Sequence, residues 1–189
     1  MPEGRRLSAD DWTSAALAAL AEGGVGAVAV EPLAARLGAT KGSFYWHFRN
    51  RDALLEAALQ RWERLETDDV IARVETEPDP RRRLRKLFFH AIGGGLPGKA
   101  RTGSVEPALQ AAAVHPLVAP VLARVTHRRL DYLDAQFRAL GLPPAVARHR
   151  ALLAYTAYLG HAQLAHATPG ISLGDLDAYA DDAIAVLTM

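Results

Sequence analysis

Residues 33–48, LAARLGATKGSFYWHF, decide the fold of this chain. They predict two short helices joined at Gly38, because glycine tolerates the backbone conformation of a sharp turn. The second helix opens at Thr40, whose hydroxyl is suited to capping a helix N-terminus. Lysine, serine, tyrosine, tryptophan and histidine follow within two turns. This composition on a second helix is typical of a helix-turn-helix that enters a DNA groove.

The residues before this stretch predict a first helix. Ser8 is placed to cap it, and Trp12 and Leu20 belong to its apolar stripe. The helix should end at the two consecutive glycines 23 and 24. A second helix is expected from about Val30, with Pro32 in its first turn, where a missing N–H does little harm. Three helices therefore form the N-terminal unit.

The third helix of this unit should have one buried and one exposed face. Phe44 and Phe48 are four residues apart and are expected to face the core. Tyr45 should then lie at the flank. The residues left to face outward are Lys41, Ser43, Trp46 and His47.

The rest of the chain also has helical periodicity. A long helix is expected from about Asn50 to as far as Val74, broken by Pro78 and Pro80. Further helices are expected over residues 81–92, 105–114, 117–140 and 143–167, and a last one runs to the C-terminus. Residues 25–30 are the one candidate strand. The sequence therefore predicts an all-α fold of about nine helices.

Composition restricts the classes of function. The chain has 189 residues, half of them apolar, 23% charged, and a net charge of only +1. Contact with DNA must therefore be made by a few well-placed groups rather than by bulk charge. The absence of cysteine excludes disulfides and zinc-thiolate sites. No secretory signal opens the chain, and no run approaches the roughly 18 apolar residues of a membrane helix, so we expect a cytoplasmic protein.

Residues 8–55 resemble the DNA-binding domain of TetR-family transcriptional regulators. The resemblance rests on Leu33-Ala34, Gly38, Thr40-Lys41-Gly42-Ser43-Phe44-Tyr45, His47-Phe48 and Arg51-Asp52-Ala53-Leu54. The chain departs from the family pattern at Ala29, where a hydroxyl cap is usual, at Arg51, where lysine is commoner, and at the bulky Trp46. The resemblance implies a helix-turn-helix DNA-binding domain over residues 1–56. It is joined through the long helix to an effector-binding and dimerisation domain over residues 57–189.

The resemblance also implies the residues that contact DNA. Phosphate contacts are expected from Thr40, Tyr45, His47 and Arg51. Base-edge contacts are expected from Lys41, Gly42, Ser43 and Trp46. One such unit touches too few bases to be selective, so two are needed, roughly 34–36 Å apart. This requires a homodimer, paired through its last two helices by the family pattern, on an inverted-repeat (palindromic) operator in double-stranded DNA.

The resemblance also implies a small-molecule effector, held among helices four to eight. An apolar cavity with a few polar groups is the expected form of its site. The candidate contacts are Trp62, Phe89, His90, Arg124, His127, Tyr155 and Tyr158. The same histidines can equally be exposed helix residues. Arg124, Arg128 and Arg129 together fit a solvated face better than an anion site.

Two other sequence patterns approach known ligand-binding motifs without matching them. Residues 93–100 approach a phosphate-binding loop, but Ala100 replaces the required hydroxyl and a helix precedes the loop. His161 and His166 are five residues apart, which does not align them on one helix face. We expect no cofactor and no metal site.

The prediction is a repressor that its effector releases from DNA, and no enzyme activity is expected. Two alternatives stay open. One is an architectural DNA-binding protein without an effector, which would favour more surplus positive charge. The other is an all-α enzyme that uses His90, His127 or His161 as an acid or base.

Overall fold

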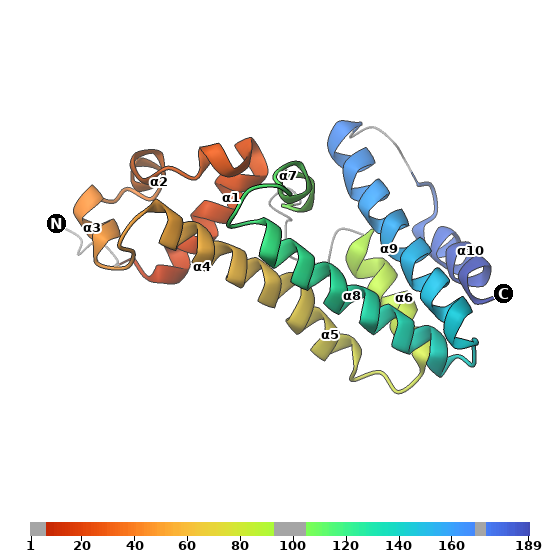
Figure 1. Ribbon diagram of the computed structural model, residues 1–189. Coiled ribbons are helices and arrows are strands. Elements are labelled where there is room, and N and C mark those ends of the chain that lie inside the picture. Colours follow the sequence, from red (N-terminus) through yellow and green to blue (C-terminus); the bar gives the residue numbers. More distant parts are fainter. Residues whose placement is uncertain (1–6, 93–104, 169–172) are drawn as a thin grey trace. The chain divides into compact units, whose positions relative to one another are not determined.

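The computed structural model describes residues 7–92, 105–168 and 173–189 (Figure 1). Within them the chain is helical and has no strand, which confirms the predicted all-α class. The helices are α1 (Ala9–Ala27), α2 (Val30–Arg36), α3 (Lys41–Tyr45), α4 (Arg51–Glu63), the π-helical turn η1 (Arg64–Asp68), α5 (Asp69–Val74), α6 (Pro80–Ala91), α7 (Glu106–Ala111), α8 (Ala119–Ala139), α9 (Pro144–Ala167) and α10 (Leu176–Thr188). They form two compact units. The first extends to Glu63 and includes α7 up to Leu122, and the second holds the remainder.

Helix α1 begins where the sequence predicts. The Ser8 hydroxyl accepts from the Asp11 N–H at 3.2 Å, and the Ser8 N–H donates to the Asp11 carboxylate at 2.8 Å. Regular helix breaks at the two glycines, where Gly24 has a φ of +69°. One further helical turn then runs to Ala27. The strand considered for residues 25–30 is therefore wrong, because its first half is helical.

The first unit is centred on α1. This helix packs on α4 and α7 and buries Trp12 and Leu20 completely. Helix α4 contributes Leu54, Leu55 and Leu59, also fully buried. The tight turn after α2 requires glycine, since Gly38 has a φ of +62°.

Helix α3 is only five residues long. Helices of fewer than about 12 residues are marginal in water, so α3 depends on its contacts. The Thr40 hydroxyl caps it by accepting from the Ser43 N–H at 3.2 Å. Phe44 is fully buried, and its ring meets Trp12 edge-on with centroids 5.3 Å apart. Phe48 is buried beside it, as the four-residue spacing predicts.

The long helix predicted from Asn50 to Val74 is interrupted. The Asn50 carboxamide oxygen accepts from the Ala53 N–H at 2.9 Å, so helix formation begins there. Between α4 and α5, residues Arg64–Asp68 form a π-helical turn. When this run is counted once, the described residues contain nine helices, as predicted.

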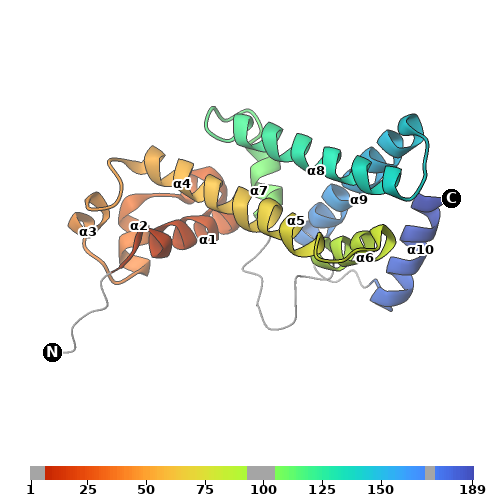
Figure 2. The same ribbon diagram turned by 90° about the horizontal axis from the view of Figure 1, so that it is seen from below.

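The second unit packs α6, α8, α9 and α10 around a small core. Its buried residues are Leu84, Phe137, Ala147 and Ala151. Helix α6 lies beside α10 (Figure 2). The Asp175 carboxylate caps α10 by accepting from two N–H groups at 2.9 and 3.2 Å.

Two sequence features fall outside the described residues. They are the phosphate-loop-like segment 93–100 and the Pro169-Gly170 break. Among the helices that the structure describes, none is both long and apolar enough to cross a membrane.

We predict that Phe44→Ala lowers the free energy of unfolding of the first unit by about 3–5 kcal/mol, because it opens a cavity against Trp12. Tyr45→Ala, one residue later, removes a half-exposed ring and should cost about 1 kcal/mol or less. Urea unfolding followed by circular dichroism compares the two variants. Equal costs would contradict the anchoring role of Phe44.

Candidate nucleic-acid interface and ligand cavity

The outer face of α3 is polar and aromatic. Trp46 is 81% exposed and Tyr45 55% exposed, although both are large side chains that usually find cover. A shallow hollow on this face is lined by Leu7, Thr40, Gly42, Ser43, Trp46 and His47. The structure thus brings five of the predicted DNA-contacting residues around one feature, and it leaves the adjacent Lys41 and Tyr45 exposed as well.

Local contacts fix the direction of several of these groups. A His47 ring nitrogen, Nε2, lies 2.9 Å from the Leu7 carbonyl oxygen. The Tyr45 ring packs edge-on against buried Phe44, with centroids 5.2 Å apart, and more than half of the side chain stays exposed. These two contacts restrict the His47 and Tyr45 side chains to the exposed side of α3.

Lys41 has a partner that sequence reasoning missed. Its ammonium lies 2.7 Å from the carboxylate of Glu31 in the first turn of α2, and both side chains are exposed. The hydrogen bond lowers the pKa of Glu31 and raises the pKa of Lys41. Glu31 carries little signal of this pairing, because an acidic residue in a first helical turn is ordinary.

Arg51 faces the backbone of its own unit. Its Nε donates to the Val28 carbonyl at 2.7 Å, and a terminal nitrogen donates to the Val25 carbonyl. A third contact joins it to the Asp52 carboxylate at 3.2 Å. The guanidinium therefore holds the connection between α1 and α2. The expected phosphate contact of Arg51 stays a prediction.

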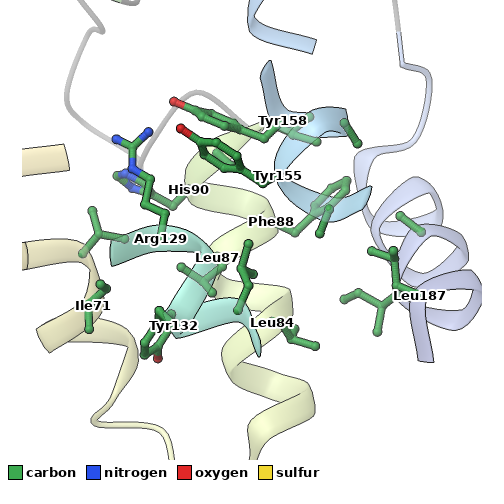
Figure 3. A pocket seen from close by; sticks show the side chains of 18 of the residues that line it. Ile71, Leu84, Leu87, Phe88, His90, Arg129, Tyr132, Tyr155, Tyr158 and Leu187 are labelled. Atoms are coloured by element: carbon green, nitrogen blue, oxygen red, sulfur yellow. The ribbon is translucent and has the colours of Figure 1, made fainter. Parts of the chain in front are cut away.

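A cavity of about 180 Å³ lies within the second unit (Figure 3). Side chains from η1, α5, α6, α8, α9 and α10 line it. Most of the lining is apolar and includes Leu84, Leu87, Phe88, Ile71, Leu133, Phe137, Ile184 and Leu187. A mainly apolar cavity with a few polar groups is the usual form of a small-molecule site.

The polar groups of the cavity gather at one end. Figure 3 places the Arg129 guanidinium, the His90 ring and the hydroxyls of Tyr155 and Tyr158 on the side away from Leu187. Arg129 lies over the Tyr158 ring, 5.6 Å from its centroid. The Tyr155 hydroxyl is 3.2 Å from the hydroxyl of Thr126.

Arg129 also holds the π-helical turn. Its Nε donates to the buried Thr67 hydroxyl at 3.0 Å, and a terminal nitrogen donates to the Glu66 carbonyl oxygen at 3.2 Å. The Glu66 carboxylate lies 3.5 Å from His90 Nε2. Glu66 and Thr67 both line the cavity, so the turn is part of its wall.

Tyr132 lines the same cavity but directs its hydroxyl elsewhere. The hydroxyl donates to the Glu75 carboxylate at 2.7 Å. Burial and this hydrogen bond raise the pKa of Tyr132. Its phenol therefore contributes a ring, rather than an ionisable group, to the cavity.

The seven predicted effector contacts divide into two groups. His90, Tyr155 and Tyr158 line the cavity together. The other four, Trp62, Phe89, Arg124 and His127, are not part of its lining.

Each residue of the second group has a different setting. Trp62 is 3% exposed and belongs to the first unit. The Phe89 ring lies under the Arg85 guanidinium, 4.8 Å away. His127 is exposed, with Nδ1 2.8 Å from the Ala123 carbonyl oxygen, and Arg124 is exposed.

Sequence reasoning overlooked Arg129 as a cavity residue. A signal was present, because Arg129 lies four residues before Leu133 and eight before Phe137, on one face of α8. No group of three potential metal ligands occurs among residues 7–92, 105–168 and 173–189.

Helix α9 carries apolar side chains that the described part of the chain leaves exposed. Leu152 and Leu153 are each 52% exposed, and Leu164 lies on the same helix with equal exposure. Small residues, among them Ala157 and Gly160, lie between them and are also exposed. Helix α10 adds the exposed side chains of Tyr179 and Val186.

Comparison with known proteins agrees with this geometry. Residues 13–58 match the profile of bacterial regulatory proteins of the tetR family. No curated protein matches the sequence significantly.

Solved structures share the fold over nearly the whole chain. A TetR-family regulator from Agrobacterium tumefaciens is 19% identical, with 95% of each chain covered and a TM-score of 0.75. A transcriptional regulator from Saccharomonospora viridis, crystallised with choline, is 21% identical, with 94% of this chain and 95% of that one covered and a TM-score of 0.76. AibR, crystallised with isovaleryl coenzyme A and operator DNA, is 21% identical, with 95% and 97% covered and a TM-score of 0.69.

We predict that Arg51→Met destabilises the first unit by about 1–2 kcal/mol, because the Val25 and Val28 carbonyls lose their donor. Arg36→Met is the matched control. It removes a pair of 2.8 Å bonds to Glu22 that water screens on the surface, so its effect should be much smaller. Thermal unfolding measures both, and an Arg51→Met variant as stable as Arg36→Met would refute the positioning role.

Proposed function

We propose that this chain, which carries the DNA-binding region of the TetR family and has the fold of its regulators, is a homodimeric repressor. It binds an inverted-repeat operator and leaves it when a small molecule enters the cavity of the second unit. Such a protein acts in the cytoplasm, where bacterial DNA lies.

The observation that carries the proposal is the two-sided build of α3. One side is anchored by Phe44, and the other leaves Lys41, Tyr45 and Trp46 exposed to solvent, with Ser43 half-buried beside them. Exposed polar and aromatic groups on a helix-turn-helix face suit the major groove. If α3 served only to stabilise the core, its large aromatic side chains would be expected to be buried.

The residues take two kinds of role on DNA. Thr40, Tyr45 and His47 contact phosphates, which fix the register of the protein on the duplex. Base edges are contacted by Lys41, Gly42, Ser43 and Trp46. Lys41 donates to guanine, and the Trp46 ring packs against a thymine methyl group. Glu31 directs the Lys41 ammonium across this surface.

Selective binding requires two copies of this surface. The exposed apolar face of α9, together with Tyr179 and Val186 of α10, provides the area on which a second copy packs. A closed twofold pair uses the same patch on both subunits, so a single face is sufficient. The spacing of the two α3 helices then sets the spacing of the operator half-sites.

We infer that the π-helical turn couples ligand and DNA. Glu66 and Thr67 belong to the cavity wall, and α4 of the DNA-binding unit ends at the residue before the turn. π-helical turns occur frequently at functional sites. A ligand that binds one conformation of this turn more tightly than the other shifts the population of the DNA-bound form.

We predict that Tyr45→Phe weakens operator binding about tenfold or more, because each subunit loses a hydroxyl that contacts a phosphate. The operator is first selected from random duplex DNA with the wild-type protein. Gel-shift titration then gives the affinities. Tyr132→Phe makes the same chemical change in the second unit and should leave affinity unchanged.

Two results would contradict the proposal. One is an unchanged affinity of Tyr45→Phe for the selected operator. The other is a wild-type protein that enriches no inverted repeat and binds random duplexes equally well.

We predict that Leu153→Asp converts the dimer to a monomer, because it places a charge in the apolar contact. Its side chain is already half exposed in the single chain, so the fold should survive, as circular dichroism can verify. Analytical ultracentrifugation measures the mass. Gln60→Asp adds a charge on the exposed side of α4 and should remain dimeric; a dimeric Leu153→Asp variant would place the interface elsewhere.

A further inference from the structure

The cavity of the second unit has two chemically different ends. Leu84, Leu87, Phe88 and Leu187 form an apolar end, and the charged and hydroxyl groups around Arg129 form the other (Figure 3). A ligand that fills it is therefore apolar along its length and polar at one terminus. A ligand with polar groups along both ends would leave them without partners among the leucines.

The volume limits the size of the apolar part. The cavity measures about 180 Å³. An engineered apolar cavity of about 150 Å³ in another protein accepts benzene. The apolar part of the ligand is thus a single aromatic ring or a chain of about six to eight carbons.

The charges at the polar end indicate the sign of the ligand head group. Arg129 is always cationic, and the hydrogen bonds to Thr67 and Glu66 hold its guanidinium at the cavity. The His90 ring lies beside it with Nε2 3.5 Å from the Glu66 carboxylate, and Glu66 is the one carboxylate among the described residues of the lining. A cationic ligand would approach the fixed guanidinium, whereas a carboxylate would pair with it in a planar, two-bond arrangement.

We propose that the cavity binds a small monocarboxylic acid, aryl or medium-chain alkyl, as its carboxylate, with the head group at Arg129. This rests on the proposed function as a ligand-released regulator and names the chemical class of the effector. The carboxylate competes with the Thr67 hydroxyl and the Glu66 carbonyl for the same guanidinium. Binding therefore weakens the hold of α8 on the π-helical turn.

The test is calorimetric titration of the full-length protein with five probes. They are 3-phenylpropanoate and octanoate, the matched neutral 3-phenylpropanamide and octanamide, and the cation 3-phenylpropyl-trimethylammonium. Each carboxylate should bind at least about tenfold more tightly than its amide. The cation should be the weakest of the five. An amide or the cation that binds as tightly as the carboxylates, or carboxylates that do not bind, would overturn the proposal.

Three variants locate the binding. Arg129→Gln should abolish the preference for carboxylate over amide. Arg128→Gln changes an exposed arginine one residue earlier on α8, paired with Asp68 at 3.8 Å, and should keep that preference. Leu87→Trp fills the apolar end and should abolish binding of all probes. It also decides the matter if Arg129→Gln does not fold, because carboxylate binding that survives Leu87→Trp refutes the cavity as the site.

The same samples separate this inference from the proposed function. Operator binding is measured by gel shift with and without each probe. If the wild-type protein binds its selected operator but no carboxylate, the ligand class is wrong and the regulator proposal stands. If the protein selects no operator, the regulator proposal itself fails, whatever the titrations give.

Discussion

Burial of the Phe44 ring against Trp12 is the contact on which the reading surface depends. Helix α3 is too short to be stable by its own hydrogen bonds, so its position is set by this aromatic contact, by Phe48 and by the Thr40 cap. The same contacts therefore determine the positions of the polar side chains on the outer face of α3. The outer surface of α3 has a defined orientation because the opposite side of the helix is apolar and closely packed.

The second unit contains an apolar cavity with a charged arginine at one end. Leucines and aromatic rings from several helices leave a cavity, and Arg129 connects its polar end to η1 through Thr67 and Glu66. A single guanidinium therefore takes part in two structures, the wall of a binding site and the irregular turn of a long helix. A change at one of them cannot leave the other unaffected.

Sequence reasoning predicted what depends on local spacing. Phe44 and Phe48, four residues apart, gave the buried face of α3, and Gly38 and Thr40 gave the turn and the cap. The π-helical turn was not predicted, because its five residues include no helix-breaking glycine or proline and its form is a property of the backbone.

Cavity residues were harder to predict, since six separate elements converge on the site. Trp62 and Tyr155 are both buried aromatics on helices, and spacing alone does not say which of two cores each one joins. Arg129 was assigned to solvent because arginine usually lies there. Its place on the face of Leu133 becomes meaningful only when the opposing helices are known.

The distribution of indole rings has an optical consequence. Trp12 and Trp62 are 0% and 3% exposed, whereas Trp46 is 81% exposed on the open side of the reading helix. A water-soluble collisional quencher reaches the last of these and not the other two. Protection of Trp46 from the quencher therefore reports that a ligand covers the outer surface of α3. The fluorescence of Trp12 and Trp62 provides a constant background.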